Sequence, residues 1–146
     1  MRPVPVFLLL SSLCCGTAVA GADWFTVTGD PQDEQVDTVQ VDPRTHGSGG
    51  TLQMRISRTQ PRISWDGVPY RSYTAQVAFD CVAKRAQYHS ISFHLEPLWR
   101  GDPHRTVDYR TGEPRMMEFR EMRPNPTARI IAAACNTGAH RPAAPS

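Results

Sequence analysis

The sequence has no strong excess of positive or negative charge. Its 146 residues include 16 basic and 14 acidic side chains, which gives a formal net charge of +2. Proteins that bind nucleic acid through the phosphates carry a basic patch or stripe. Arginines do recur between residues 100 and 121, but carboxylates are interleaved with them and leave that stretch nearly neutral. We therefore expect no nucleic-acid partner.

The sequence also lacks the motifs that catalysis or metal binding would require. It has five histidines, none of them paired at a spacing typical of zinc ligands. His89 and His94 lie five residues apart on a predicted strand, so their side chains point to opposite faces. No Gly-x-Ser-x-Gly turn is present to expose a serine nucleophile. We expect a protein that is not an enzyme and that has no cofactor and no metal site.

Long apolar runs are missing as well. The run at residues 4–13 is too short for a membrane-spanning helix, which needs about 20 apolar residues. It follows Met1-Arg2 and leads to the small residues Ala18-Val19-Ala20, a pattern typical of a secretory signal peptide. We predict that residues 1–20 are removed and that the chain is exported, to the periplasm, the cell surface or the medium.

Cysteine is scarce, with four in the chain. Cys14 and Cys15 fall in the predicted signal peptide. Neither fits a lipoprotein signal, which has a small residue directly before the cysteine, because Leu13 precedes Cys14 and Cys14 precedes Cys15. We expect no lipid anchor, and contact with the membrane only through the transient signal peptide. Cys81 and Cys135 then remain, and an oxidising compartment favours a disulfide between them. Two separate buried thiols are the alternative.

Alternation of apolar and polar residues predicts a sheet. The clearest strand spans residues 71–82, because Tyr73, Val77 and Cys81 fall on one face and polar residues on the other. Similar patterns predict strands at 24–28, 35–41, 51–58 and 85–95. The dipeptide Asp66-Gly67 predicts a hairpin turn. Residues 82–84 form either a tight turn or a bulge in one bent strand, and residues 96–123, where the patterning fades, are expected to be a loop.

The last predicted element is a helix at residues 127–135. Asn125 can cap it, Pro126 suits its first position and Gly138 suits its end. So short a helix is marginal in water unless it packs on something else. The expected fold is therefore α+β: a small, mainly antiparallel sheet with a C-terminal helix tied to it by one disulfide. Residues 21–136 form one domain, and residues 137–146 are expected to be a disordered tail.

Aromatic residues beside arginines are candidates for binding, because such side chains dominate recognition surfaces. The candidate contact residues are Trp65, Tyr70, Arg71, Trp99 and Arg100. The alternative is that the rings form the core of the domain. Trp65, at the predicted turn, is the best candidate for exposure.

These features together resemble a known family. A first strand containing Trp24, the block Val77-Ala78-Phe79-Asp80-Cys81, the pair Lys84-Arg85 and a Pro-capped helix ending at Cys135 occur in the order found in bacterial surface-adhesin protein E. The resemblance covers about residues 23–136, with Phe119 where a tryptophan is expected. It implies a Cys81–Cys135 disulfide and a surface protein that binds host matrix proteins. A periplasmic housekeeping or stress domain is the alternative function.

Overall fold

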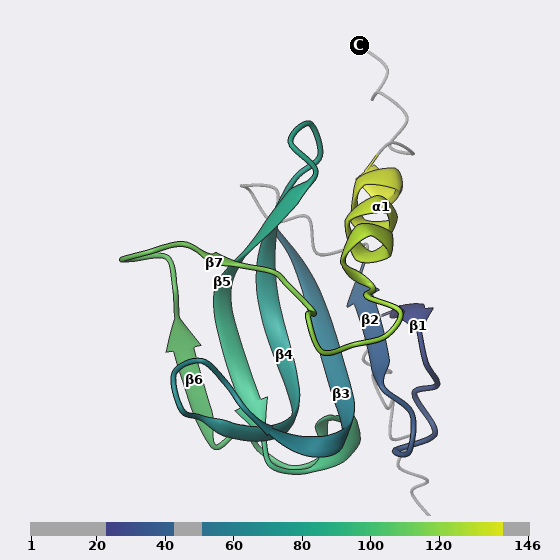
Figure 1. Cartoon of the computed structure of the whole chain (residues 1–146), viewed down its shortest axis with the longest axis vertical. Coiled ribbons are helices and arrows are strands. Elements are labelled where there is room, and N and C mark those ends of the chain that lie inside the picture. The colour runs from purple at the N-terminus through teal and green to yellow at the C-terminus, as the bar shows by residue number, and fades with distance from the viewer. Residues whose placement is uncertain (1–22, 43–50, 139–146) are drawn as a thin grey trace, which may run out of the picture.

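The computed structural model describes residues 23–42 and 51–138 (Figure 1). The predicted signal peptide and residues 139–146 of the predicted tail lie outside the described residues. The elements in chain order are β1 (Phe25–Thr28), β2 (Thr38–Asp42), β3 (Thr51–Ile63), β4 (Pro69–Asp80), β5 (Arg85–His94), the 3-10 turn η1 (Pro97–Trp99), β6 (Arg105–Asp108), β7 (Arg115–Met116) and α1 (Thr127–Gly138). The predicted α+β fold is confirmed.

The strands form one antiparallel sheet in which each strand from β1 to β5 pairs with the next along the chain. The order is β1-β2-β3-β4-β5-β6, and β7 pairs with β5 beyond the end of β6. β2 begins at Thr38 rather than at Gln35 as predicted, because a turn intervenes. In that turn the N–H of Val36 donates to the carbonyl of Asp33, and Asp33 Oδ1 accepts from the N–H of Gln35 at 2.8 Å.

The prediction of a loop at residues 96–123 is wrong, because β6 and β7 lie within it. β6 continues the sheet through pairs such as Ile91 with Val107, and β7 pairs Tyr88 with Arg115. Both strands are short and lie at the edge of the sheet, with side chains that are mostly exposed. Burial therefore imposes no alternation of apolar and polar residues that could have revealed them.

A bulge in β5 interrupts the regular alternation of faces in that strand. The pairing with β4 shifts between Gln76 and Val77, so that His89 has no partner residue in the β4–β5 register. Tyr88 and Ile91 consequently lie on the same face, although residues three apart point to opposite faces in a regular strand. Tyr88 is only 1% exposed and belongs to the core.

The core lies on one face of the sheet, under two separate covers. One cover is α1, which contacts β1, β2 and β4 and contributes Ile130, Ile131 and Ala134. The other is the chain after β6, which buries Tyr109, Met117, Phe119 and Met122. In Figure 1 the chain after β7 crosses the sheet to reach the start of α1. The two covers meet the side chains of β3, β4 and β5 in a single cluster.

The predicted helix is confirmed and extends to Gly138, so it takes in two residues of the predicted tail. Asn125 caps it as expected, because its Oδ1 accepts from the N–H of Thr127 at 3.0 Å. The first helical hydrogen bond runs from the N–H of Ile130 to the carbonyl of Pro126 at 2.9 Å.

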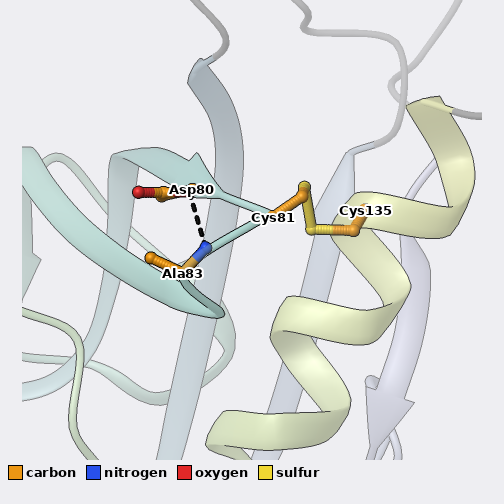
Figure 2. Close-up of a disulfide and its surroundings, with 4 residues drawn as sticks. All are labelled: Asp80, Cys81, Ala83 and Cys135. Carbon is orange, nitrogen blue, oxygen red and sulfur yellow. Dashed lines mark hydrogen bonds between the residues drawn. A yellow bond between two sulfur atoms is a disulfide. The ribbon is translucent and has the colours of Figure 1, made fainter.

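The predicted disulfide joins Cys81 to Cys135, with Cα atoms 5.7 Å apart (Figure 2). Cys81 lies in the turn after β4 rather than inside the strand, so residues 81–84 form a hairpin turn and not a bulge. Asp80 Oδ1 closes this turn by accepting from the N–H of Ala83 at 2.9 Å. The bridge ties the β4–β5 hairpin to the last turns of α1.

Candidate functional site: the tyrosine–arginine pocket

A cavity of about 330 Å³ opens between the β3–β4 hairpin and the segment 116–121. Its floor is the core face of β4 and β5, and its lining residues there are Tyr73, Tyr88, Ile91 and Phe93. The hairpin contributes Arg58, Arg62, Trp65 and Tyr70. The opposite wall includes Phe119 and Glu121. We call this cavity the tyrosine–arginine pocket.

The hairpin turn presents Trp65 at the mouth of the pocket. Ser64 Oγ accepts from the N–H groups of Asp66 and Val68, at 3.3 and 3.1 Å. Gly67 completes the turn with φ of +74°, a conformation that glycine adopts without strain. The predicted turn and the exposure of Trp65 are both confirmed, since its side chain is 50% exposed. The centre of its ring lies 5.8 Å from that of Tyr88, so Trp65 packs against one of the floor residues.

A second aromatic residue secures this turn from outside the pocket. Tyr109 donates its hydroxyl proton to Asp66 Oδ2 at 2.5 Å. Burial of the ring, and then the bond to the Asp66 carboxylate, raise the pKa of Tyr109 above its ordinary value. The hydroxyl therefore stays protonated and holds the turn at neutral pH.

A pair of tyrosine hydroxyl groups lies on the floor. The hydroxyl oxygens of Tyr73 and Tyr88 are 2.7 Å apart. Burial raises the pKa of both residues, because a phenolate would lose its hydration there. Both hydroxyls therefore keep their protons at neutral pH. One proton forms the hydrogen bond between them, and the other remains available to an acceptor.

We expect that replacing Tyr73 or Tyr88 by Phe will lower the free energy of unfolding by about 1–3 kcal/mol, because each change leaves a buried hydroxyl without its partner. The double variant should lose less than the sum of the two, since two phenyl rings leave no polar group unpaired. Urea unfolding of the four proteins measures this coupling. Simple additivity would contradict it.

Two arginines bring further donors to the pocket. Arg58 is only 5% exposed, and its Nε lies 3.5 Å from Asp37 Oδ2 without forming a hydrogen bond. Arg62 Nη1 pairs with Glu121 Oε2 at 2.7 Å, but its Nε is buried and unpaired. Buried N–H groups normally have an acceptor. These two Nε–H groups are enclosed by protein and have no acceptor among the described residues. The lining as a whole carries three arginines, Arg58, Arg62 and Arg120, against the two carboxylates of Glu118 and Glu121.

Arg71 and Arg100, two of the predicted contact residues, converge on Glu34 instead of the pocket. Arg71 donates through Nε to the carbonyl of Arg58 at 3.1 Å and through Nη2 to the carbonyl of Glu34 at 3.5 Å. Arg100 forms an ion pair with the Glu34 carboxylate. These arginines fix the 31–37 loop to β3, β4 and η1.

Trp99 lies on the opposite face of the sheet. Its ring stacks under the guanidinium of Arg55 at 3.9 Å, and Trp24 stacks on the same guanidinium at 4.3 Å. Arg55 lies between the core residues Met54 and Ile56, so it projects from the face that the core does not use. Burial lowers the pKa of Arg55. Of the five predicted contact residues, the structure brings only Trp65 and Tyr70 together in the pocket.

Sequence reasoning missed Arg58, Arg62 and Tyr88 as pocket residues. A signal existed for Arg58, which continues the apolar alternation of Met54 and Ile56 in β3. No comparable signal existed for Tyr88, because the bulge reverses its face.

The described residues contain no group of three or more His, Cys, Asp or Glu side chains placed to hold a metal. Within the same ranges, no helix combines the length and the apolar character needed to span a membrane.

Residues 24–136 match the model of a family described as surface-adhesin protein E. Comparison with curated proteins found no match, and comparison with solved structures found none. The matched range contains every strand and the whole pocket.

Proposed function

Because the chain belongs to the surface-adhesin protein E family, we propose that it is an exported, non-enzymatic protein of the bacterial cell envelope that binds host or envelope proteins. The family match over residues 24–136 carries this proposal. The disulfide supports the export, since such bonds form and persist in oxidising compartments.

The tyrosine–arginine pocket supports a binding role. Trp65 is a large, half-exposed ring held by a short turn beside a cavity. Tryptophan, tyrosine and arginine are the residues that contribute most binding energy at protein interfaces. We place the contact surface around Trp65 and Tyr70. Trp99 and Arg100 stay outside it, because one packs on the opposite face and the other pairs with Glu34.

The chemistry of the pocket supports binding over catalysis. A general base works best with a pKa near the operating pH. Burial moves the pKa of Tyr73 and Tyr88 upward instead, so both hydroxyls are donors at neutral pH. If the purified protein turned over any substrate in this pocket, that activity would contradict the proposal.

Cellular location tests the proposal. Protease added to intact cells should degrade the protein if it is displayed on the surface, while a periplasmic marker protein survives. A chain that survives with the marker would instead be the periplasmic housekeeping or stress domain.

Binding of the purified protein to immobilised host matrix proteins tests the contact surface. We expect Trp65→Ala to weaken binding about tenfold or more, because truncation of a tryptophan anchor costs on the order of 2 kcal/mol. Phe25→Ala is the matched control, since Phe25 is a 53% exposed ring on β1, an edge strand away from the β3–β4 turn that holds Trp65. Equal binding by the two variants would exclude Trp65 from the contact surface.

A further inference from the structure

We propose that the tyrosine–arginine pocket binds a carboxylate group attached to a small apolar body. This inference does not rest on the adhesive role, because a periplasmic protein could use the same pocket. It rests on the polar groups of the pocket, on its charge and on its apolar walls.

The pocket offers a ligand more hydrogen-bond donors than acceptors. The donors are the second hydroxyl proton of the Tyr73–Tyr88 pair and the guanidinium groups of three lining arginines, Arg58, Arg62 and Arg120, whereas the described lining has only two carboxylates, Glu118 and Glu121. A carboxylate is an acceptor with about four lone-pair sites on two oxygens, so one group can satisfy several of these donors. An ammonium group offers only donors and could pair with none of these donors.

The charge of the pocket favours an anion. Arg62 is paired with Glu121, and Arg120 is paired with Glu118 through Nε at 2.6 Å. Arg58 is the most deeply buried of the lining arginines, and its contact with Asp37 is an ion pair at 3.5 Å without a hydrogen bond. A buried cation is costly unless it is paired and hydrogen-bonded. An incoming carboxylate would complete the pairing of Arg58.

The walls select a ligand with an apolar part. Phe93, Ile91 and Phe119 line the cavity, and so does Trp65. Its volume of about 330 Å³ is at the lower end of the range for small-ligand sites, roughly 300–1,000 Å³. Inorganic phosphate or sulfate would meet the donors but would leave these rings uncovered. An aromatic or aliphatic acid fits both.

The carboxylate could be supplied by a free small acid or by an acidic side chain of a protein. The recognition chemistry is the same in both cases, so two pairs of probes distinguish the sources. Phenylacetate and phenylacetamide represent the free molecule. A capped peptide of sequence Ala-Phe-Glu-Phe-Ala and its Gln counterpart represent the protein. Each pair differs only in the charged group.

Heteronuclear NMR titration of the disulfide-bonded protein at neutral pH measures binding, with the indole N–H of Trp65 as a reporter at the pocket. We expect at least one acid to bind about tenfold or more tightly than its amide, as loss of one charge-assisted hydrogen bond predicts. Binding by phenylacetate alone would identify a small acid as the source, and binding by the Glu peptide alone a protein.

Arg62→Gln tests the site without endangering the fold, because its partner Glu121 is largely exposed and such surface pairs contribute little to stability. We expect this variant to weaken binding of the acid about tenfold and to leave the amide unchanged. Arg85→Gln is the matched control, since exposed Arg85 lies opposite Asp80 in the β4–β5 ladder, at the end of β4 away from the β3–β4 hairpin.

Two results would overturn the inference. The first is equal affinity for acid and amide in both pairs, which would make the pocket a purely apolar site. The second is the absence of binding by either acid at about 10 mM, a concentration at which a ligand with a Kd of about 1 mM would occupy most of the sites. An Arg62→Gln protein that binds the acid as well as the Arg85→Gln protein does would also contradict it.

Discussion

Cys81→Ser and Cys135→Ser are each expected to lower the free energy of unfolding by about 2–5 kcal/mol, and the double variant should lose no more. The two cysteines are 54 residues apart in the sequence. In the chain-entropy model, closing a loop of that size removes enough freedom from the unfolded chain to stabilise the fold by about 4 kcal/mol. The helix depends on this bridge more than the sheet does, because so short a helix is marginal alone.

Urea unfolding of the oxidised protein and of the three variants measures the effect. Val82→Ala is the control for substitution in the turn, since Val82 is almost fully exposed beside Cys81. Reductant should destabilise the unaltered protein to the level of the variants and leave the variants unchanged. Single variants as stable as the oxidised protein would show that the bridge does not stabilise this fold.

Gly29→Ala is expected to lower the free energy of unfolding by about 2–5 kcal/mol, through backbone strain and overpacking together. Gly29 has φ of +85°, and an added Cβ would lie 2.4 Å from the carbonyl oxygen of Asp37 and 2.6 Å from Thr38 Cα. Those are backbone atoms at the start of the buried strand β2. The Thr38 hydroxyl also holds this corner, because it donates to the carbonyl of Asp30 at 2.9 Å. Neither neighbour can move without disturbing the β1–β2 pairing.

Gly112→Ala separates the two causes. Gly112 also has positive φ, at +97°, but nothing lies within 4 Å of its added Cβ. Its cost should be that of backbone strain alone, about 1–2 kcal/mol. Denaturant unfolding of both variants gives the comparison. If the Gly29→Ala and Gly112→Ala variants lost the same stability, the close approach of Asp37 and Thr38 to Gly29 would not contribute to the loss.

The parts of the fold that could be predicted are those where burial on one face repeats along the chain. β3 and β4 are long and central, so the core imposed a visible alternation on residues such as Met54, Ile56 and Tyr73. β6 and β7 carry no such pattern, because they pair only at the edge. The helix was predictable from local chemistry, since Asn125 caps it with its own side chain.

The candidate site was predictable only where one short segment defined it. The Asp66-Gly67 turn placed Trp65 correctly on the surface. The rest of the pocket depends on contacts between distant segments: Arg62 meets Glu121 across 59 residues, and Tyr73 meets Tyr88 only because a bulge turns the second ring inward. Arg100 was separated from the pocket by its ion pair with Glu34, 66 residues away. Contacts between such distant segments leave no periodic pattern in the sequence.

The position of the disulfide also determines how the chain responds to mechanical tension. A force pulling on the two ends of the chain passes from Cys81 to Cys135 through the sulfur atoms, so the residues between them bear none of it. At about 3.4 Å per residue, the 54-residue separation corresponds to roughly 180 Å of chain that tension cannot draw out. β5, β6, β7 and one wall of the pocket lie inside this shielded loop, whereas β1 to β4 remain in the path of the load.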